Sequence, residues 1–207
     1  MAIAQSLTAF RTSLSQCDNL IANAHSSATS GAHYFPLIDR EQITVAAFLN
    51  MFIAWEEFIE ATICGFMLGA PTINGTQPTR FVSPTNKEHS LKMVIHTNRY
   101  FDYANQDSVK KLAKLYFDNG YPFDPPISSL SQELTQLKTI RNACAHMSST
   151  TKTAFETIAM QVLGAPQPGI SVYQLLTAII PNSKPSVTVF ASYKEKLLTA
   201  AQIIAEG

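Results

Sequence analysis

Apolar side chains recur every three to four positions along most of the chain, which is the spacing of one face of a helix. The first stretch with this pattern covers residues 2–29 and contains neither proline nor glycine. The second covers residues 40–68, with Asp39 expected as its N-cap. It places a narrow row of large side chains on one face: Phe48, Phe52, Trp55, Ile59, Thr62 and Phe66. The pattern predicts two long helices, of which the second is the central core helix.

Shorter helical patterns fill the rest of the chain. Residues 71–87 are rich in Pro, Thr, Gly and Asn and are expected to form a long surface loop. Further helices are predicted over residues 86–97, 108–119 and 128–147, the last with Ser128 or Ser129 as its N-cap. Ser149 or Thr150 is expected to cap the next helix, which Gly164 ends.

The C-terminal segment is predicted to form a helix over residues 169–180, a turn, a short extended piece over 187–190 and a last helix over 193–205. We expect an all-α helical bundle with two long antiparallel helices, a variable helical insert and extra C-terminal helices. Residues 1–165 would form the main domain, with 166–207 packed on it as an extension.

The composition sets limits on function. Hydrophobic residues make up 46% of the 207 and charged residues only 14%, which predicts that a partner, most simply a second copy, covers part of the surface. The formal net charge is zero, so any nucleic-acid binding must rely on a local patch. Cys17, Cys64 and Cys144 are too widely spaced for a zinc site or a disulfide framework, and we expect reduced thiols in a cytoplasm.

No targeting or membrane segment is predicted. The N-terminus has no charged region followed by an apolar one, so a signal peptide is not expected. The most hydrophobic stretch, residues 43–70, is interrupted by Asn50 and by three glutamates, Glu56, Glu57 and Glu60. A membrane span would not tolerate these residues without a functional reason, so we expect a soluble, cytoplasmic protein.

One part of the chain is basic. The stretch between positions 87 and 114 contains six basic residues and three acidic ones. Histidines and aromatic side chains that could stack on bases are interleaved with them. A solvated helix face is the alternative interpretation for any single lysine. The RNA-binding candidates are Lys87, Lys92, Arg99, Lys110, Lys111 and Lys114, together with Lys138 further along the chain.

The candidate chemistry is concentrated in the sequence Arg-Asn-Ala-Cys-Ala-His, residues 141–146, near the end of the helix predicted over 128–147. On a helical wheel Arg141 falls inside the apolar stripe, and Asn142 and His146 share a neighbouring face. A buried guanidinium needs a carboxylate, a ligand anion or a polar interface, and Glu56 is its natural partner. The alternative is purely structural, with Arg141 tied to an acid and His146 in the last helical turn.

The Arg141–His146 motif resembles the Arg-x(4–6)-His signature of HEPN-domain ribonucleases, and the order of helices over residues 1–165 resembles prokaryotic members of the RiboL-PSP type. The resemblance implies an HEPN-like bundle and metal-independent RNA cleavage without a cofactor. It implies catalytic roles for Arg141, Asn142 and His146, with Glu56 in support. A symmetric homodimer would supply the two histidines that general acid and base roles need.

The resemblance further implies a toxin or defence effector that acts on RNA and is held in check by an antitoxin or other inhibitory protein. Two alternatives remain open. The first is a catalytically silent HEPN-like module that binds a nucleotide or RNA or holds a dimer together. The second is a plain helical interaction protein in which Arg141 and Glu56 form a salt bridge.

Overall fold

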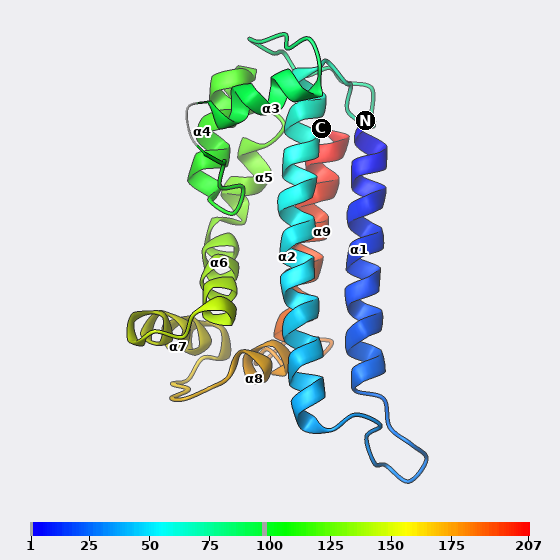
Figure 1. Ribbon diagram of the computed structural model, residues 1–207, viewed down its shortest axis with the longest axis vertical. Helices are drawn as coiled ribbons and strands as arrows, with labels where there is room; N and C mark the ends of the chain where they lie inside the picture. The colour runs from blue at the N-terminus through cyan, green and yellow to red at the C-terminus, as the bar shows by residue number, and fades with distance from the viewer. Residues whose placement is uncertain (1, 97–98) are drawn as a thin grey trace. The chain divides into compact units, whose positions relative to one another are not determined.

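The computed structural model describes residues 2–96 and 99–207, and this part of the chain is all-α, as predicted (Figure 1). It contains nine α-helices, a 3₁₀ helix over Asp118–Gly120 and isolated β-bridges without a named strand. The α-helices are α1 (Ile3–Ala24), α2 (Leu37–Met67), α3 (Lys87–Ile95), α4 (Gln106–Tyr116), α5 (Asp124–Ser129), α6 (Ser131–Ala145), α7 (Ser149–Leu163), α8 (Val172–Thr177) and α9 (Val189–Glu206).

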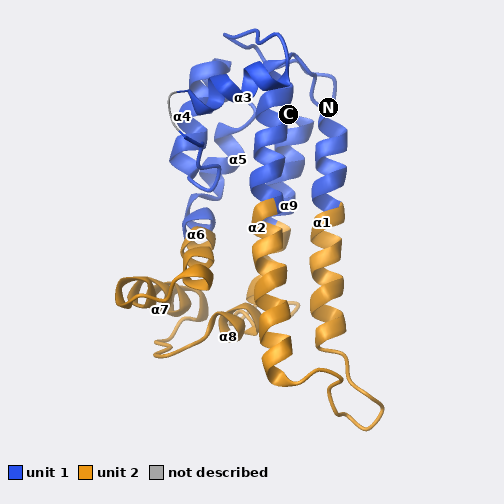
Figure 2. Cartoon of the chain, viewed as in Figure 1, with its two compact units in different colours: residues 1–11, 54–135, 196–207 blue, residues 12–53, 136–195 orange. Residues whose placement is uncertain are grey.

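The chain divides into two compact units, each built from segments that are distant in sequence (Figure 2). Unit 1 contains residues 1–11, 54–135 and 196–207, and unit 2 contains residues 12–53 and 136–195. Helices α1, α2, α6 and α9 each contribute to both units. The units therefore do not test the predicted division at residue 165, which stays a prediction.

Helix α2 is the core helix that the pattern predicts. The six residues of its predicted stripe are all buried. The helix begins at Leu37, earlier than expected, because the amide of Arg40 already donates to the carbonyl of Pro36 at 3.2 Å. The prediction of Asp39 as N-cap is therefore wrong. Asp39 lies in the first turn, where its negative carboxylate interacts favourably with the positive end of the helix dipole.

Helix α2 is also long and apolar enough to cross a membrane, judged by length and composition alone. Half of the relevant window is buried inside the protein, as in the core helix of a soluble protein. This is weak evidence for membrane crossing, and the structure is compatible with a soluble protein. The cytoplasmic location stays a prediction.

The core of unit 1 is aromatic. Phe66 of α2 packs edge-on against Phe117 and Phe123, with ring centroids 6.4 and 5.8 Å apart. The predicted surface loop before α3 is attached to this core, since Arg80 donates to the carbonyl of Met67 at 2.6 Å. Asn86 caps α3. The predicted end of that helix at Thr97 lies outside the described residues.

Unit 2 contains the later part of α6, from residue 136, and the first part of α9, up to residue 195, together with α7 and α8. Helix α7 ends where the sequence places it, with Gly164 in the left-handed conformation. The prediction of Ser149 or Thr150 as its N-cap is wrong, because Ser148 caps the helix by accepting from the amide of Thr151 at 3.2 Å. The extended piece predicted over residues 187–190 is wrong for Val189 and Phe190, which begin α9. The backbone is bridged only at Thr188, opposite Ile179. Both helical residues are buried, so helix packing outweighs their β propensity.

Candidate functional site

The Arg141–His146 motif forms the end of α6. This helix begins at Ser131, and residues 124–129 form the separate helix α5, so the predicted single helix over 128–147 is wrong. Ser129 Oγ donates to the carbonyl of Pro126 at 2.8 Å and does not cap α6. Helix α6 ends at Ala145, and the amide of His146 continues the last turn by donating to the carbonyl of Asn142 at 2.9 Å.

Arg141 is exposed, so the prediction that it lies in the buried stripe is wrong. The buried face of this half of α6 is formed by Leu137, Ile140 and Ala143. Successive residues of a helix are about 100° apart, so Arg141 lies at the margin of a face centred near Ile140. Its guanidinium stays in water and carries no desolvation cost.

The three polar side chains of the motif are exposed together at this end of the helix. Arg141 Nη1 donates to Asn142 Oδ1 at 3.3 Å, and His146 is exposed just beyond. Among the described residues of unit 2, no carboxylate forms an ion pair with Arg141. Glu56 is half-exposed and belongs to unit 1, so its pairing with Arg141 stays a prediction. The guanidinium, the amide and the imidazole are available to a ligand.

Cys144, inside the motif, is not equipped to act as a nucleophile. Burial raises the pKa of its thiol to about 11, although the charge of Arg141 acts in the opposite direction. The thiol is therefore protonated at neutral pH, whereas nucleophilic attack needs the thiolate. Across the described residues, no group of three or more His, Cys, Asp or Glu side chains could hold a metal ion.

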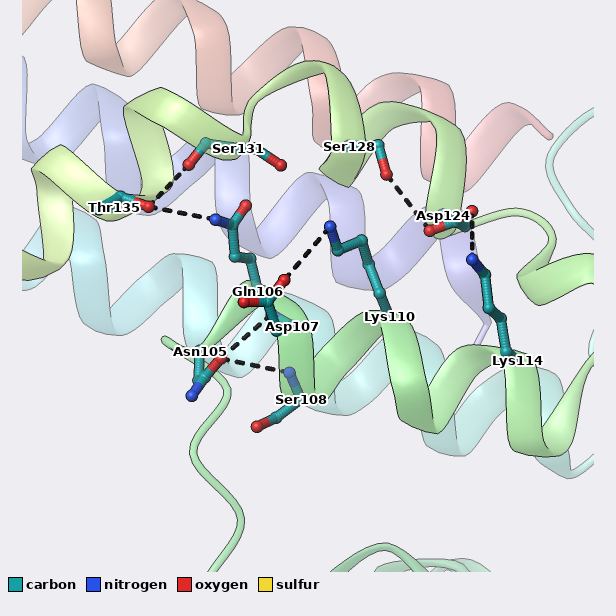
Figure 3. A network of polar contacts seen from close by, with 10 residues as sticks. All are labelled: Asn105, Gln106, Asp107, Ser108, Lys110, Lys114, Asp124, Ser128, Ser131 and Thr135. Atoms are coloured by element: carbon teal, nitrogen blue, oxygen red, sulfur yellow. Dashed lines mark hydrogen bonds and ion pairs between the residues drawn. The ribbon is translucent and has the colours of Figure 1, made fainter.

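Most of the basic region lies in unit 1, away in sequence from the motif. Three of its lysines are paired with acids: Lys92 with Glu88 at 2.8 Å, Lys110 with Asp107 at 3.3 Å and Lys114 with Asp124 at 3.2 Å, the last two shown in Figure 3. Lys87, Arg99 and Lys111 are exposed, and Lys138 is half-buried in α6 within unit 2. Local pairing reduces the positive charge that this region offers to RNA.

Sequence reasoning missed the contact that fixes the motif helix in unit 2. Tyr193 of α9 donates its hydroxyl proton to Gln136 Oε1 of α6 at 2.8 Å, and both residues are buried. The available indication was a glutamine four positions before Ile140, on the buried face of the helix. Its partner is 57 positions away, which no local pattern reveals.

Comparison with known proteins identifies no relative. No family model matches the chain, and neither a curated protein nor a solved structure is significantly similar to it.

Proposed function

We propose that this protein is a metal-independent endoribonuclease whose active site is completed by a second copy of the chain. The observation that supports the proposal is the joint exposure of Arg141, Asn142 and His146 at one helix end. A planar guanidinium that no carboxylate of its unit engages can bind a phosphate through two parallel hydrogen bonds. An imidazole exposed at the same helix end is the side-chain type best suited to accept and donate protons in the physiological range.

The proposed reaction is an internal transfer at phosphorus. His146 of one copy accepts the proton of the ribose 2′-hydroxyl, and the 2′-oxygen forms a bond to phosphorus. The bond from phosphorus to the 5′-oxygen breaks, and a protonated histidine of the other copy donates a proton to that oxygen. Arg141 stabilises the charge on the phosphoryl oxygens in the transition state, while Asn142 holds the guanidinium in position.

The second copy follows from the number of proton-transfer groups. The motif has one histidine, and the thiol of Cys144 is protonated, so the motif of a single chain lacks the second group. A two-fold axis beside the end of α6 would bring both histidines to one phosphate. The exposed apolar side chain of Met147, directly after His146, is suited to an interface there.

Labelled RNA tests the proposal. The purified protein should cleave it to products with a 2′,3′-cyclic phosphate and a 5′-hydroxyl, and 2′-deoxyribose at the scissile position should block cleavage. Products with a 3′-hydroxyl and a 5′-phosphate, or cleavage of the deoxy substrate, would contradict the mechanism.

A second candidate is a catalytically silent module that binds RNA or holds a dimer together through the same motif. The ion pairs that engage Lys92, Lys110 and Lys114 reduce the positive charge available to RNA, and this favours the form of the candidate that only holds a dimer together. Binding of RNA without any cleavage would support this candidate. A role as a toxin or defence effector, restrained by an inhibitory protein, rests on the sequence resemblance alone.

A further inference from the structure

A second polar cluster lies in unit 2 where α1 is joined to α2. His25 follows the last residue of α1, His33 lies in the connecting loop, and Arg40 lies near the start of α2. The loop is bridged at Ser27 and His33, whose Oγ and Nδ1 atoms are 3.0 Å apart. His25 is fixed from two sides: its Nε2 lies 3.3 Å from Thr44 Oγ1, and its ring stacks on Tyr173 of α8 with centroids 5.8 Å apart.

Arg40 is the unusual member of this cluster. It is half-buried, and its guanidinium has neither a hydrogen bond nor an ion pair within the described residues. Its Nε atom is buried without an acceptor. Asp39 and Glu41 flank it in α2 but do not pair with it, since neighbouring helical residues point about 100° apart. A partly desolvated cation without a counter-charge is costly, so a counter-charge from outside the chain would stabilise it.

Each of the two histidines also has one ring nitrogen that could bind a ligand. Each has one ring nitrogen beside a hydroxyl, so Nδ1 of His25 and Nε2 of His33 have no partner in the described part of the chain. Burial lowers the pKa of His25, and the charges of Arg40 and His33 lower it further. Arg40 lies one helical turn before Thr44, the residue that His25 contacts, so its positive charge lies close to the His25 ring and favours an anion there.

We propose that Arg40, His25 and His33 form a binding site for a phosphate group. The planar guanidinium supplies two parallel donors, and each imidazole supplies one more when its free nitrogen is protonated. The site shares no residue with the Arg141–His146 motif, so this proposal does not depend on the proposed ribonuclease activity.

Titration of the intact protein with inorganic phosphate at pH 6.5 tests the site. The NMR resonances of the His25 and His33 ring protons should shift saturably, the pKa of His25 should rise, and the melting temperature should rise with phosphate concentration. Arg40→Gln should abolish these responses. In phosphate-free buffer it should melt no lower than the wild type, and the pKa of its His25 should be higher because a nearby cation is gone. Arg11→Gln, which removes an exposed arginine of unit 1, is the matched control and should respond like the wild type.

The phosphate could be a soluble ion or the headgroup of a lipid, because the end of the loop and the first turn of α2 expose apolar side chains, including Tyr34 at 67% and Ile38 at 62%. Sedimentation with phosphatidic acid vesicles separates the two sources. Vesicle binding that Arg40→Gln abolishes indicates a headgroup, and saturation by phosphate alone indicates a soluble ion. The proposal is overturned if neither probe binds, or if Arg40→Gln binds as well as the wild type. His33→Gln provides a second test should Arg40→Gln not fold.

Discussion

The hydrogen bond from Tyr193 to Gln136 should be a measurable part of the stability of unit 2. Both side chains are buried, at 4% and 7% exposure, and the oxygen atoms are 2.8 Å apart. Gln136 has one further contact, a long one of 3.5 Å from its amide nitrogen to Gln161 Oε1. Tyr193→Phe removes the donor and keeps the ring, so it leaves Gln136 Oε1 buried without its partner.

The expected loss follows from that unpaired oxygen. An unsatisfied buried polar group costs about 1–3 kcal/mol, whereas replacing both partners with apolar groups is close to neutral. Tyr193→Phe should therefore lower the free energy of unfolding by about 1–3 kcal/mol, which is about 2–4 °C in melting temperature per kcal/mol for a chain of this size. The double variant Gln136→Leu, Tyr193→Phe should recover most of the loss.

Urea unfolding of the wild type, of Tyr193→Phe, of Gln136→Leu and of the double variant gives the coupling energy between the two side chains directly. Tyr34→Phe is the control, because that side chain is 67% exposed and should change stability by less than about 0.5 kcal/mol. A Tyr193→Phe variant as stable as the control, or a double variant whose loss is the sum of the two single losses, would refute the reasoning.

Three other predictions follow from the charges and the proposed site. Burial alone would raise the pKa of Glu133, but the hydrogen bond and charge of Lys196, 2.6 Å away, lower it below its ordinary value. The pair should therefore stabilise the protein above about pH 4.5 and lose its effect as the pH falls through the lowered pKa, and Lys196→Met should flatten this decline in acid unfolding curves. Analytical ultracentrifugation should show a homodimer at micromolar concentration, and an active monomer would contradict the composite site. EDTA should leave RNA cleavage unchanged, whereas activity that EDTA abolishes and magnesium restores would exclude the proposed mechanism.

The sequence predicted those elements whose cause is local. The spacing of large side chains located α2 and its buried face, and the serines and Gly164 located α7 almost to the residue. The start of α6 was misplaced because Pro125 and Pro126 begin a separate short helix, α5, which ends just before Leu130. A single apolar pattern runs across both helices and hides this break.

The environment of each candidate residue was harder to predict than its helix. The helical wheel placed Arg141 in the apolar stripe that was expected to be buried. Burial depends on which neighbouring elements pack on α6, however, and these elements are distant in sequence. The same limit applies to Arg40, whose missing counter-charge is visible only once α1, the loop and α2 are placed together. Whether a second copy completes the site is a property of an assembly and not of one chain.

The central claim is that His146 transfers a proton during RNA cleavage, and its removal tests the claim most directly. Because Arg141 and His146 are both exposed, His146→Ala and Arg141→Ala should each change stability by less than about 0.5 kcal/mol and remain dimeric. Each should lower the cleavage rate by at least about 10²-fold. Tyr34→Phe, the exposed control variant used for stability, should cleave at the wild-type rate. A folded His146→Ala dimer that cleaves RNA as fast as the wild type would contradict the account.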